Sequence, residues 1–202
     1  MADWISVPRA PDSAKDRLLL QLPASLLGDA AELSTSGLAS GFIYGPRATT
    51  SSFAPVTSTT YYFPTYIPQT ATFNALIVRT HAGYAGNATI RLGVYNNLND
   101  KPTTVVFDAG TVATALSNTR YTKTINQTLT AGWYWIAFNA QPGAGTNNFV
   151  SSFQWDGLPF VRIGINNANS PCWLQSGVTG AFATAGTLVD TTTAPVVWMG
   201  VA

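Results

Sequence analysis

Segments in which apolar and polar residues alternate recur along most of this chain, and they limit what it can fold into. They begin at Thr57 and continue to Val201, with short runs rich in Gly, Pro, Asn and Asp between them. Successive side chains of a β-strand point to opposite faces of a sheet, so a period of two predicts half-buried strands. No helical stretch is long enough to connect parallel neighbours, and we therefore expect antiparallel pairing.

The pattern predicts strands at 59–63, 72–79, 89–95, 105–112, 121–129, 133–138, 149–153, 160–165 and 196–201. Pro64 and Pro68 make the first of these an edge strand or a strand end, because proline cannot donate to a ladder. Within 89–95, Ile90, Leu92 and Val94 should point to one side, and Arg91 and Tyr95 to the other.

Turn residues and one aromatic strand refine this picture. The run 96–102 is rich in Asn and Asp and ends on Pro102, which predicts a turn. Ala131-Gly132 should close a hairpin into 133–138, which is apolar on both faces and therefore central in its sheet. We expect an all-β fold, an antiparallel β-sandwich of the jelly-roll type.

The first forty residues differ in kind. Asp12 or Ser13 can cap a short helix over 14–22 that Pro23 ends. This segment carries Leu18, Leu19, Leu20 and Leu22, which either pack on the body of the same protein or dock the arm onto another chain. The predicted organisation is an N-terminal arm or anchor at 1–40 followed by one sandwich domain at 41–202.

Charge is scarce and unevenly placed. Charged residues make up 9% of the 202 residues, against about 25% in a typical protein, whereas aromatic residues reach 12%. Nine of the 19 charged residues lie between Asp3 and Arg47. A folded surface so poor in charge suits exposed virion parts, extracellular modules and oligomers that bury subunit contacts.

The same composition argues against several partners. With a net charge of +1 and no basic run, nucleic-acid binding is not expected. No apolar stretch approaches the roughly 20 residues of a membrane-spanning helix, and the N-terminus lacks a signal-peptide pattern, so we expect synthesis in a cytoplasm without membrane insertion. Cys172 is the only cysteine and His81 the only histidine, which predicts no metal site, no cofactor and a buried structural thiol.

The number and position of the acidic residues indicate whether the chain can hydrolyse glycosides. Glycoside hydrolysis needs two carboxyl groups about 5–9.5 Å apart, and after Arg47 the only acids are Asp100, Asp108, Asp156 and Asp190. Asp156 beside Trp155 is the best candidate, but a loop carboxylate beside a core tryptophan is the simpler interpretation. We expect no enzyme. As a binding hypothesis, Trp155, Trp173 and Tyr84 could stack on sugar rings while Asp156 and asparagines bond hydroxyls.

Four short motifs in a fixed order carry a family resemblance. They are Tyr61-Tyr62-Phe63-Pro64, Ile90-Arg91-Leu92-Gly93-Val94-Tyr95, Asp108-Ala109-Gly110-Thr111-Val112 and Leu129-Thr130-Ala131-Gly132-Trp133-Tyr134-Trp135-Ile136-Ala137. Their order resembles a β-sandwich domain common in structural proteins of tailed bacteriophages. The resemblance covers roughly Tyr61 to Ala202, with Ala194-Pro195-Val196-Val197-Trp198 at its end.

This resemblance implies an exposed virion protein that forms symmetric oligomers and carries no catalytic residues. We therefore expect a fibre or spike protein, a homotrimer held on the particle by contacts of its N-terminal arm with other virion proteins, and adhesion to host surface polysaccharide. A capsid decoration protein that stabilises the head is one alternative. A carbohydrate-binding module is another.

Overall fold

The computed structural model describes residues 43–44, 52–67, 69–84, 86–142, 149–150, 172–191 and 194–201, with only the backbone described for 43, 44 and 150. These residues all belong to the unit Leu38–Ala202. The predicted arm with its helix and leucines, the predicted strand 160–165, and both Trp155 and Asp156 lie outside the described residues.

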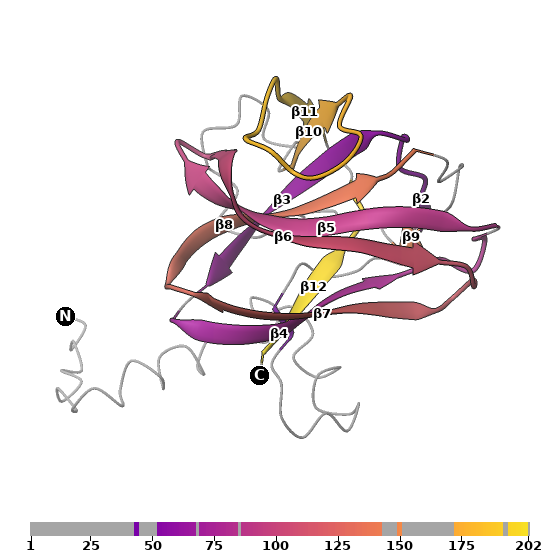
Figure 1. Cartoon of the computed structure of the whole chain (residues 1–202), viewed down its shortest axis with the longest axis horizontal. Coiled ribbons are helices and arrows are strands. Elements are labelled where there is room, and N and C mark those ends of the chain that lie inside the picture. Colours follow the sequence, from indigo (N-terminus) through magenta and orange to yellow (C-terminus); the bar gives the residue numbers. More distant parts are fainter. Residues whose placement is uncertain are drawn as a thin grey trace, which may run out of the picture. The chain divides into compact units, whose positions relative to one another are not determined.

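The described residues form strands and no helix (Figure 1). The strands are β1 (Ile43–Tyr44), β2 (Ser52–Phe53), β3 (Thr59–Ile67), β4 (Ala71–Arg79), β5 (Ala88–Leu98), β6 (Lys101–Thr114), β7 (Arg120–Leu129), β8 (Gly132–Ala140), β9 (Phe149–Val150), β10 (Cys172–Ser176), β11 (Val189–Thr191) and β12 (Val197–Val201). Within this part of the chain, no helix could cross a membrane.

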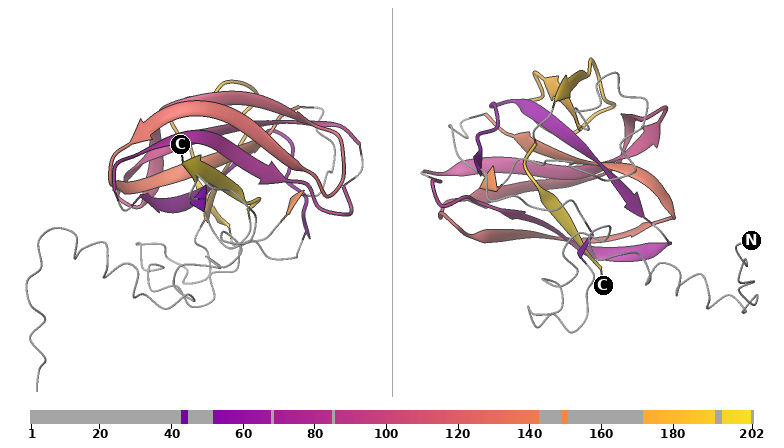
Figure 2. Two further views of the ribbon diagram at one scale, coloured as in Figure 1. Left: turned by 90° about the horizontal axis from the view of Figure 1, so that it is seen from below. Right: turned by 180° about the vertical axis from the view of Figure 1, so that it is seen from behind.

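The strands form two main antiparallel sheets that face each other (Figures 1 and 2). One sheet has the order β11-β10-β3-β8-β5-β6, the other has the order β1-β12-β4-β7, and β2 pairs with β9. The main core lies between the two sheets and includes Phe63, Leu76, Leu92, Phe138 and Met199, all at most 1% exposed. The predicted all-β sandwich is confirmed.

Alternation along β5 follows the prediction. Ile90, Leu92 and Val94 are fully buried in the main core, whereas Arg91 and Tyr95 lie on the other face of the sheet. The turn predicted after β5 is also present and shorter than expected. It consists of Asn99 and Asp100, whose φ angles of 51° and 60° make a tight hairpin into β6.

The hairpin predicted at Ala131-Gly132 is wrong. β7 pairs with β4 in the four-stranded sheet, whereas β8 lies between β3 and β5 in the six-stranded sheet. The turn therefore carries the chain from one sheet to the other. A turn motif reports only that the chain changes direction, and the pairing of the flanking strands depends on residues far away in sequence.

Of the two alternatives predicted from Pro64 and Pro68, the edge position is wrong, whereas the strand end is confirmed, because β3 ends at Ile67, the residue before Pro68. β3 lies inside the six-stranded sheet, since β8 pairs with it from Thr60 to Ile67 and β10 pairs with its residues 59–62. Pro64 lies beyond the last residue that pairs with β10. Its missing donor thus falls where β3 pairs with β8 alone in the described sheet.

The described pairings do not confirm a jelly roll. That topology distributes two Greek keys over two sheets. Here β5 and β6 are consecutive strands that pair as a hairpin within one six-stranded sheet.

β8 is apolar on both faces because both faces are covered, as predicted for a central strand. Ile136 and Phe138 point into the main core. Trp135 and Ala137 point to the outer face of the six-stranded sheet, where they belong to a second core that also contains Tyr62, Tyr95, Trp173 and Phe182. This outer face is the part of the fold that positions the candidate site.

Candidate functional site: the loop over the outer face

Residues 177–188, called here the 177–188 loop, link β10 to β11 and cover the second core. Gly177 has a φ of 79°, a left-handed conformation that glycine adopts without strain and that turns the chain away from β10. Val178, Phe182, Ala185 and Leu188 pack on or belong to the second core. The rest of the loop is built mainly of Gly, Ala and Thr, so little side-chain bulk lies between its backbone and solvent.

Backbone hydrogen bonds hold the loop down at both ends. The Val178 amide donates to the carbonyl of Ser58 at 2.8 Å, and the Asn139 side-chain amide donates to the carbonyl of Val178 at 3.2 Å. Farther along, the Ala185 amide donates to the carbonyl of Thr103 at 2.8 Å. The loop is therefore attached to the sheet at several points, as in compact Ω-loops.

Phe182 anchors the middle of the loop. Its ring is 9% exposed and lies edge-on to Tyr95, with centroids 5.6 Å apart. Gly93 lies below it, and a Cβ at that position would be 2.7 Å from Phe182 Cδ2. The glycine in the middle of β5 thus provides the space that this ring occupies.

Asp108 connects the loop to the hairpin of β5 and β6. Its carboxylate accepts from Arg91 Nη1 at 2.6 Å, from the Gly110 amide at 2.8 Å and from the Phe182 amide at 2.9 Å. Hydrogen bonds to a charged acceptor are stronger than those between neutral groups. The carboxylate is therefore fully engaged in holding the bulged strand β6 and the loop together.

Two tyrosines and one glutamine form the polar floor of the loop. Tyr62 and Tyr95 meet edge to face with centroids 5.0 Å apart, and the Tyr95 hydroxyl donates to the Ala183 carbonyl at 2.9 Å. The Tyr62 hydroxyl donates to Gln175 Oε1 at 2.9 Å. Burial raises the pKa of Tyr62 to about 12 and also raises the pKa of Tyr95, so both hydroxyls stay protonated as donors.

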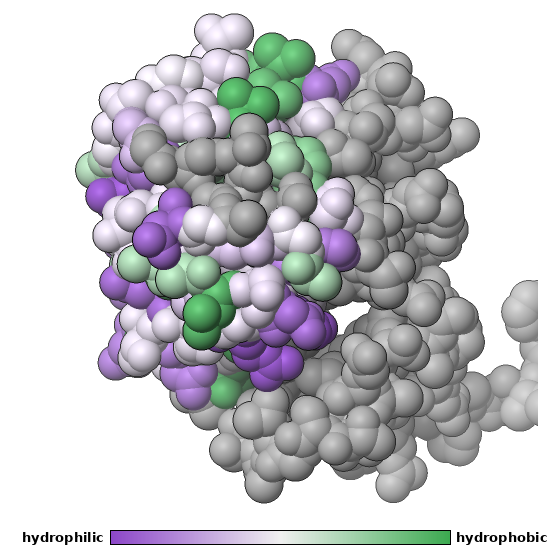
Figure 3. Space-filling view, turned by 90° about the vertical axis from the view of Figure 1, so that its right-hand side faces the viewer, coloured by the Kyte–Doolittle hydropathy of each residue, from purple (hydrophilic) through white to green (hydrophobic). Residues whose placement is uncertain are grey.

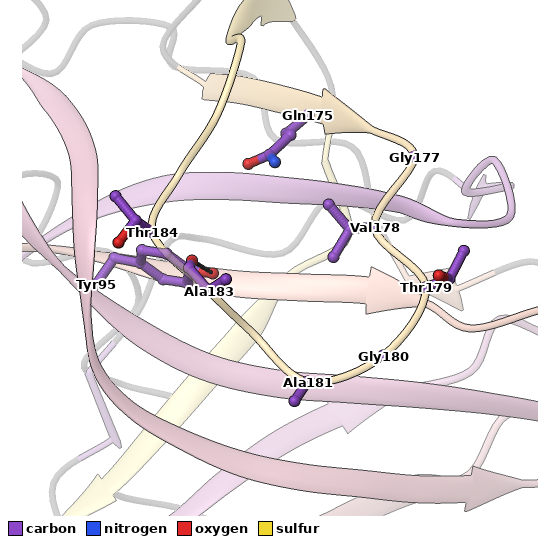
Figure 4. A pocket seen from close by; sticks show the side chains of 9 residues that line it. All are labelled: Tyr95, Gln175, Gly177, Val178, Thr179, Gly180, Ala181, Ala183 and Thr184. Carbon is purple, nitrogen blue, oxygen red and sulfur yellow. Dashed lines mark hydrogen bonds between the residues drawn. The ribbon is translucent and has the colours of Figure 1, made fainter.

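The loop borders an open pocket of about 360 Å³ beside these groups. Figure 4 shows the chain curving around it, with Gln175 and Val178 projecting to its inside and Thr184 beside Tyr95. The lining consists of Tyr95, Gln175, Gly177, Val178, Thr179, Gly180, Ala181, Ala183 and Thr184. It offers hydroxyl, carboxamide and backbone groups, and none of these lining residues carries a charge.

Two of the aromatic residues predicted to stack on sugars are buried. Trp173 is 8% exposed on β10, donates from Nε1 to the Asp100 carbonyl at 3.1 Å, and lies under Lys101 Nζ at 5.2 Å. Tyr84 is 6% exposed, and its hydroxyl donates to the Thr114 carbonyl at 2.9 Å. Neither ring offers a face to a ligand in this structure, because each completes a local packing arrangement.

The other candidate residues, three aspartates and the cysteine, lie in strands or at a turn. Asp100 forms the β5–β6 turn, Asp108 binds the loop, and Asp190 lies on β11 opposite Trp173. Cys172 is fully buried, as expected, and burial raises the pKa of its thiol. Among the described residues, no three acidic, histidine or cysteine side chains cluster as metal ligands would.

Sequence reasoning did not find the pocket or the cross-strand aromatic pair of Tyr66 and Trp133. Tyr66 is 49% exposed, and its ring centroid lies 5.1 Å from that of Trp133 on the neighbouring strand. The cross-strand register that joins them could not be read from spacing. The Gly-, Ala- and Thr-rich composition of 177–187 was the available signal for the pocket, but composition alone does not reveal a curved loop.

Comparisons of this chain with protein-family models, with curated proteins and with solved structures find no match.

Proposed function

We propose that this chain is a non-catalytic structural protein of a bacteriophage particle, displayed outward as a fibre or spike that adheres to the host surface. One observation carries the proposal. The four motifs that resemble the phage domain lie on β3, β5, β6 and β8, the fourth beginning at the end of β7, and these four strands are contiguous in the order β3-β8-β5-β6. Motifs far apart in sequence are thus neighbours in one sheet, as expected if together they specify one structural unit.

The register supports the same interpretation. Tyr62 pairs with Ala137, Val94 pairs with Ile136, and Leu92 pairs with Gly110, so each motif contacts at least one other. Pairing of the four motifs with one another would preserve this sheet and its two cores. It would not by itself create a reactive group.

The use of charge in the sandwich supports a structural role. Arg91 and Asp108 form an ion pair whose carboxylate also binds the 177–188 loop. On the coloured part of the face in Figure 3, hydrophobic residues form separate spots among hydrophilic ones, and no broad apolar patch is seen there. A chain with only 9% charged residues suits a part that associates with other copies or with other proteins of a particle.

Two alternatives follow from the same features. A capsid decoration protein needs an outward domain and an anchor, and it could stabilise the head without binding any host molecule. A free carbohydrate-binding module would use the pocket of the 177–188 loop but would not join particles. The location of the chain therefore separates the three.

The test is immunogold electron microscopy with antibodies raised against the purified protein. Particles from a lysate of the source culture should carry label at a constant position, at the tail or a spike for the first proposal and over the head for the decoration protein. Label found solely in the soluble fraction, with none on purified particles, would overturn the virion assignment and favour the free module.

A further inference from the structure

We propose that the open pocket bordered by the 177–188 loop is a binding site for an uncharged saccharide. This inference rests on the proposed role in adhesion and names the class of ligand that adhesion would use.

The lining determines the charge of the ligand. Its polar side chains are those of Gln175, Thr179 and Thr184, together with the Tyr95 hydroxyl, and all of them are neutral. A charged ligand that leaves water needs an opposite charge or many directed hydrogen bonds, and these lining residues provide no such charge. A sugar ring carries several neutral hydroxyl groups, each able to donate and accept, which matches a lining of mixed donors and acceptors.

Hydrogen bonds fix the orientation of the Gln175 side-chain amide and show which of its two end atoms is the oxygen. The Gly186 backbone amide donates to Gln175 Oε1 at 3.0 Å, and a backbone amide can only donate, so the atom that faces it must be the oxygen. The Tyr62 hydroxyl donates to the same oxygen at 2.9 Å. Nε2 is therefore the donor end of a carboxamide of fixed orientation, on a residue that lines the pocket (Figure 4).

Small residues let a ligand approach the backbone. Gly177, Gly180, Ala181 and Ala183 make up much of the pocket wall, and a Cβ at Gly180 would have nothing within 4 Å. Peptide groups of the wall can thus bond hydroxyls directly. The volume of about 360 Å³ lies near the lower end of the range of about 300–1,000 Å³ for small-molecule sites, which suits a single sugar ring with its hydroxyls.

The loop is already ordered before any ligand arrives. Its bonds to Ser58, Thr103 and Asp108, and the buried Phe182 ring, hold the pocket wall in place. Binding would therefore cost little conformational entropy. The same attachment distinguishes this pocket from a gap in a loosely held surface loop.

The experiment is a titration of the full-length protein with small neutral sugars, followed by amide chemical shifts. The probes are the methyl glycosides of glucose, galactose and mannose, and N-acetylglucosamine, with glucuronate as the charged counterpart. We expect at least one neutral sugar to bind with a dissociation constant in the millimolar range or below, with the largest shifts at residues 175–186, and glucuronate to bind more weakly.

Three variants locate the site. Gly180→Leu should fill the pocket and weaken binding about tenfold or more, and Thr184→Val, which removes one hydroxyl at constant size, should weaken it about three- to tenfold. Thr122→Val, the same change on the exposed face of β7, is the matched control and should leave binding unchanged. Melting curves would show that each variant is folded.

Several outcomes would overturn the proposal. They are the absence of any sugar-dependent shift, tighter binding of glucuronate than of every neutral sugar, shifts centred on Tyr66 and Trp133, and unchanged binding by folded Gly180→Leu. Because the titration uses purified protein, its failure is distinguishable from the failure of particle labelling: a module absent from particles could still bind sugar, and a labelled spike could still lack this site.

Discussion

The glycine beneath the Phe182 ring offers the sharpest test of how the 177–188 loop is held. In Gly93→Ala, the added methyl group would lie 2.7 Å from Phe182 Cδ2 and 2.8 Å from the Phe107 carbonyl oxygen. The ring can move because it is the end of one side chain. The carbonyl belongs to the β5–β6 ladder, where Phe107 pairs with Val94, so it can move only if the hairpin distorts.

The expected cost follows from these two contacts. Adding a methyl group to a packed site costs about 1–3 kcal/mol of unfolding free energy. If the ring is expelled instead, the second core loses its packing, for which a phenylalanine truncation of about 3–5 kcal/mol is the upper bound. We expect a loss of about 2–4 kcal/mol, which lowers the melting temperature by about 5–15 °C in a protein of this size.

Urea unfolding monitored by tryptophan fluorescence measures this loss. Gly180→Ala is the matched control, because its Cβ would have nothing within 4 Å, and it should change stability by less than about 0.5 kcal/mol. In a Phe182→Ala background the ring clash is absent while the contact with the Phe107 carbonyl remains, so Gly93→Ala should cost less than in the wild type but still destabilise the protein. Equal costs in the two backgrounds, or equal costs for the two glycine variants, would refute the reasoning.

Four further predictions concern stability and assembly. Asp108→Ala removes the acceptor of three hydrogen bonds and should lower the unfolding free energy by about 2 kcal/mol in urea melts, whereas an unchanged midpoint would mean that the network is not stabilising. Folding raises the pKa of Tyr62 to about 12, so the folded state holds the hydroxyl proton more tightly than the unfolded state. The contribution of Tyr62 to the unfolding free energy should therefore be fully present below pH about 10 and fall by up to about 3 kcal/mol as the pH rises toward 12. Melting curves recorded across this pH interval would measure the loss. Deleting residues 1–37 should leave a folded sandwich that no longer joins particles, and a truncated protein that melts far lower or still incorporates would contradict the anchor role. Light scattering of the full chain should give about three times 21.4 kDa, and a monomer would exclude the trimer.

Local alternation was enough to predict most of the strands. The positions of β4, β5, β6, β7, β8 and β12 follow from side chains that point alternately to two faces, a property of the backbone itself. The prediction that β8 is central followed in the same way, since a strand apolar on both faces must be covered twice. These features can be predicted without knowing which strands pair with one another.

The sequence also indicated where the chain turns, but not what the turn joins. Asn99 and Asp100 form a hairpin within one sheet, whereas the turn before Gly132 leads from one sheet to the other. Both were predicted to close hairpins or turns from their own residues, without reference to the strands that would pair. The difference is that β7 pairs with β4, whereas β8 pairs with β3 and β5, and contacts between residues far apart in the sequence determine these pairings.

The candidate site shows the same division. In the sequence, Gly93 and Asp108 belong to two predicted strands, and Phe182 lies outside every predicted strand. Only the tertiary structure brings them together, by placing β6 beside β5 and laying the 177–188 loop over both. The sequence by itself therefore determined that this protein consists of strands with two distinct faces in an antiparallel sandwich, because alternation is a local property. The tertiary structure decided which strands pair, which aromatic rings are buried and where a pocket forms. These features depend on contacts between residues far apart in the chain.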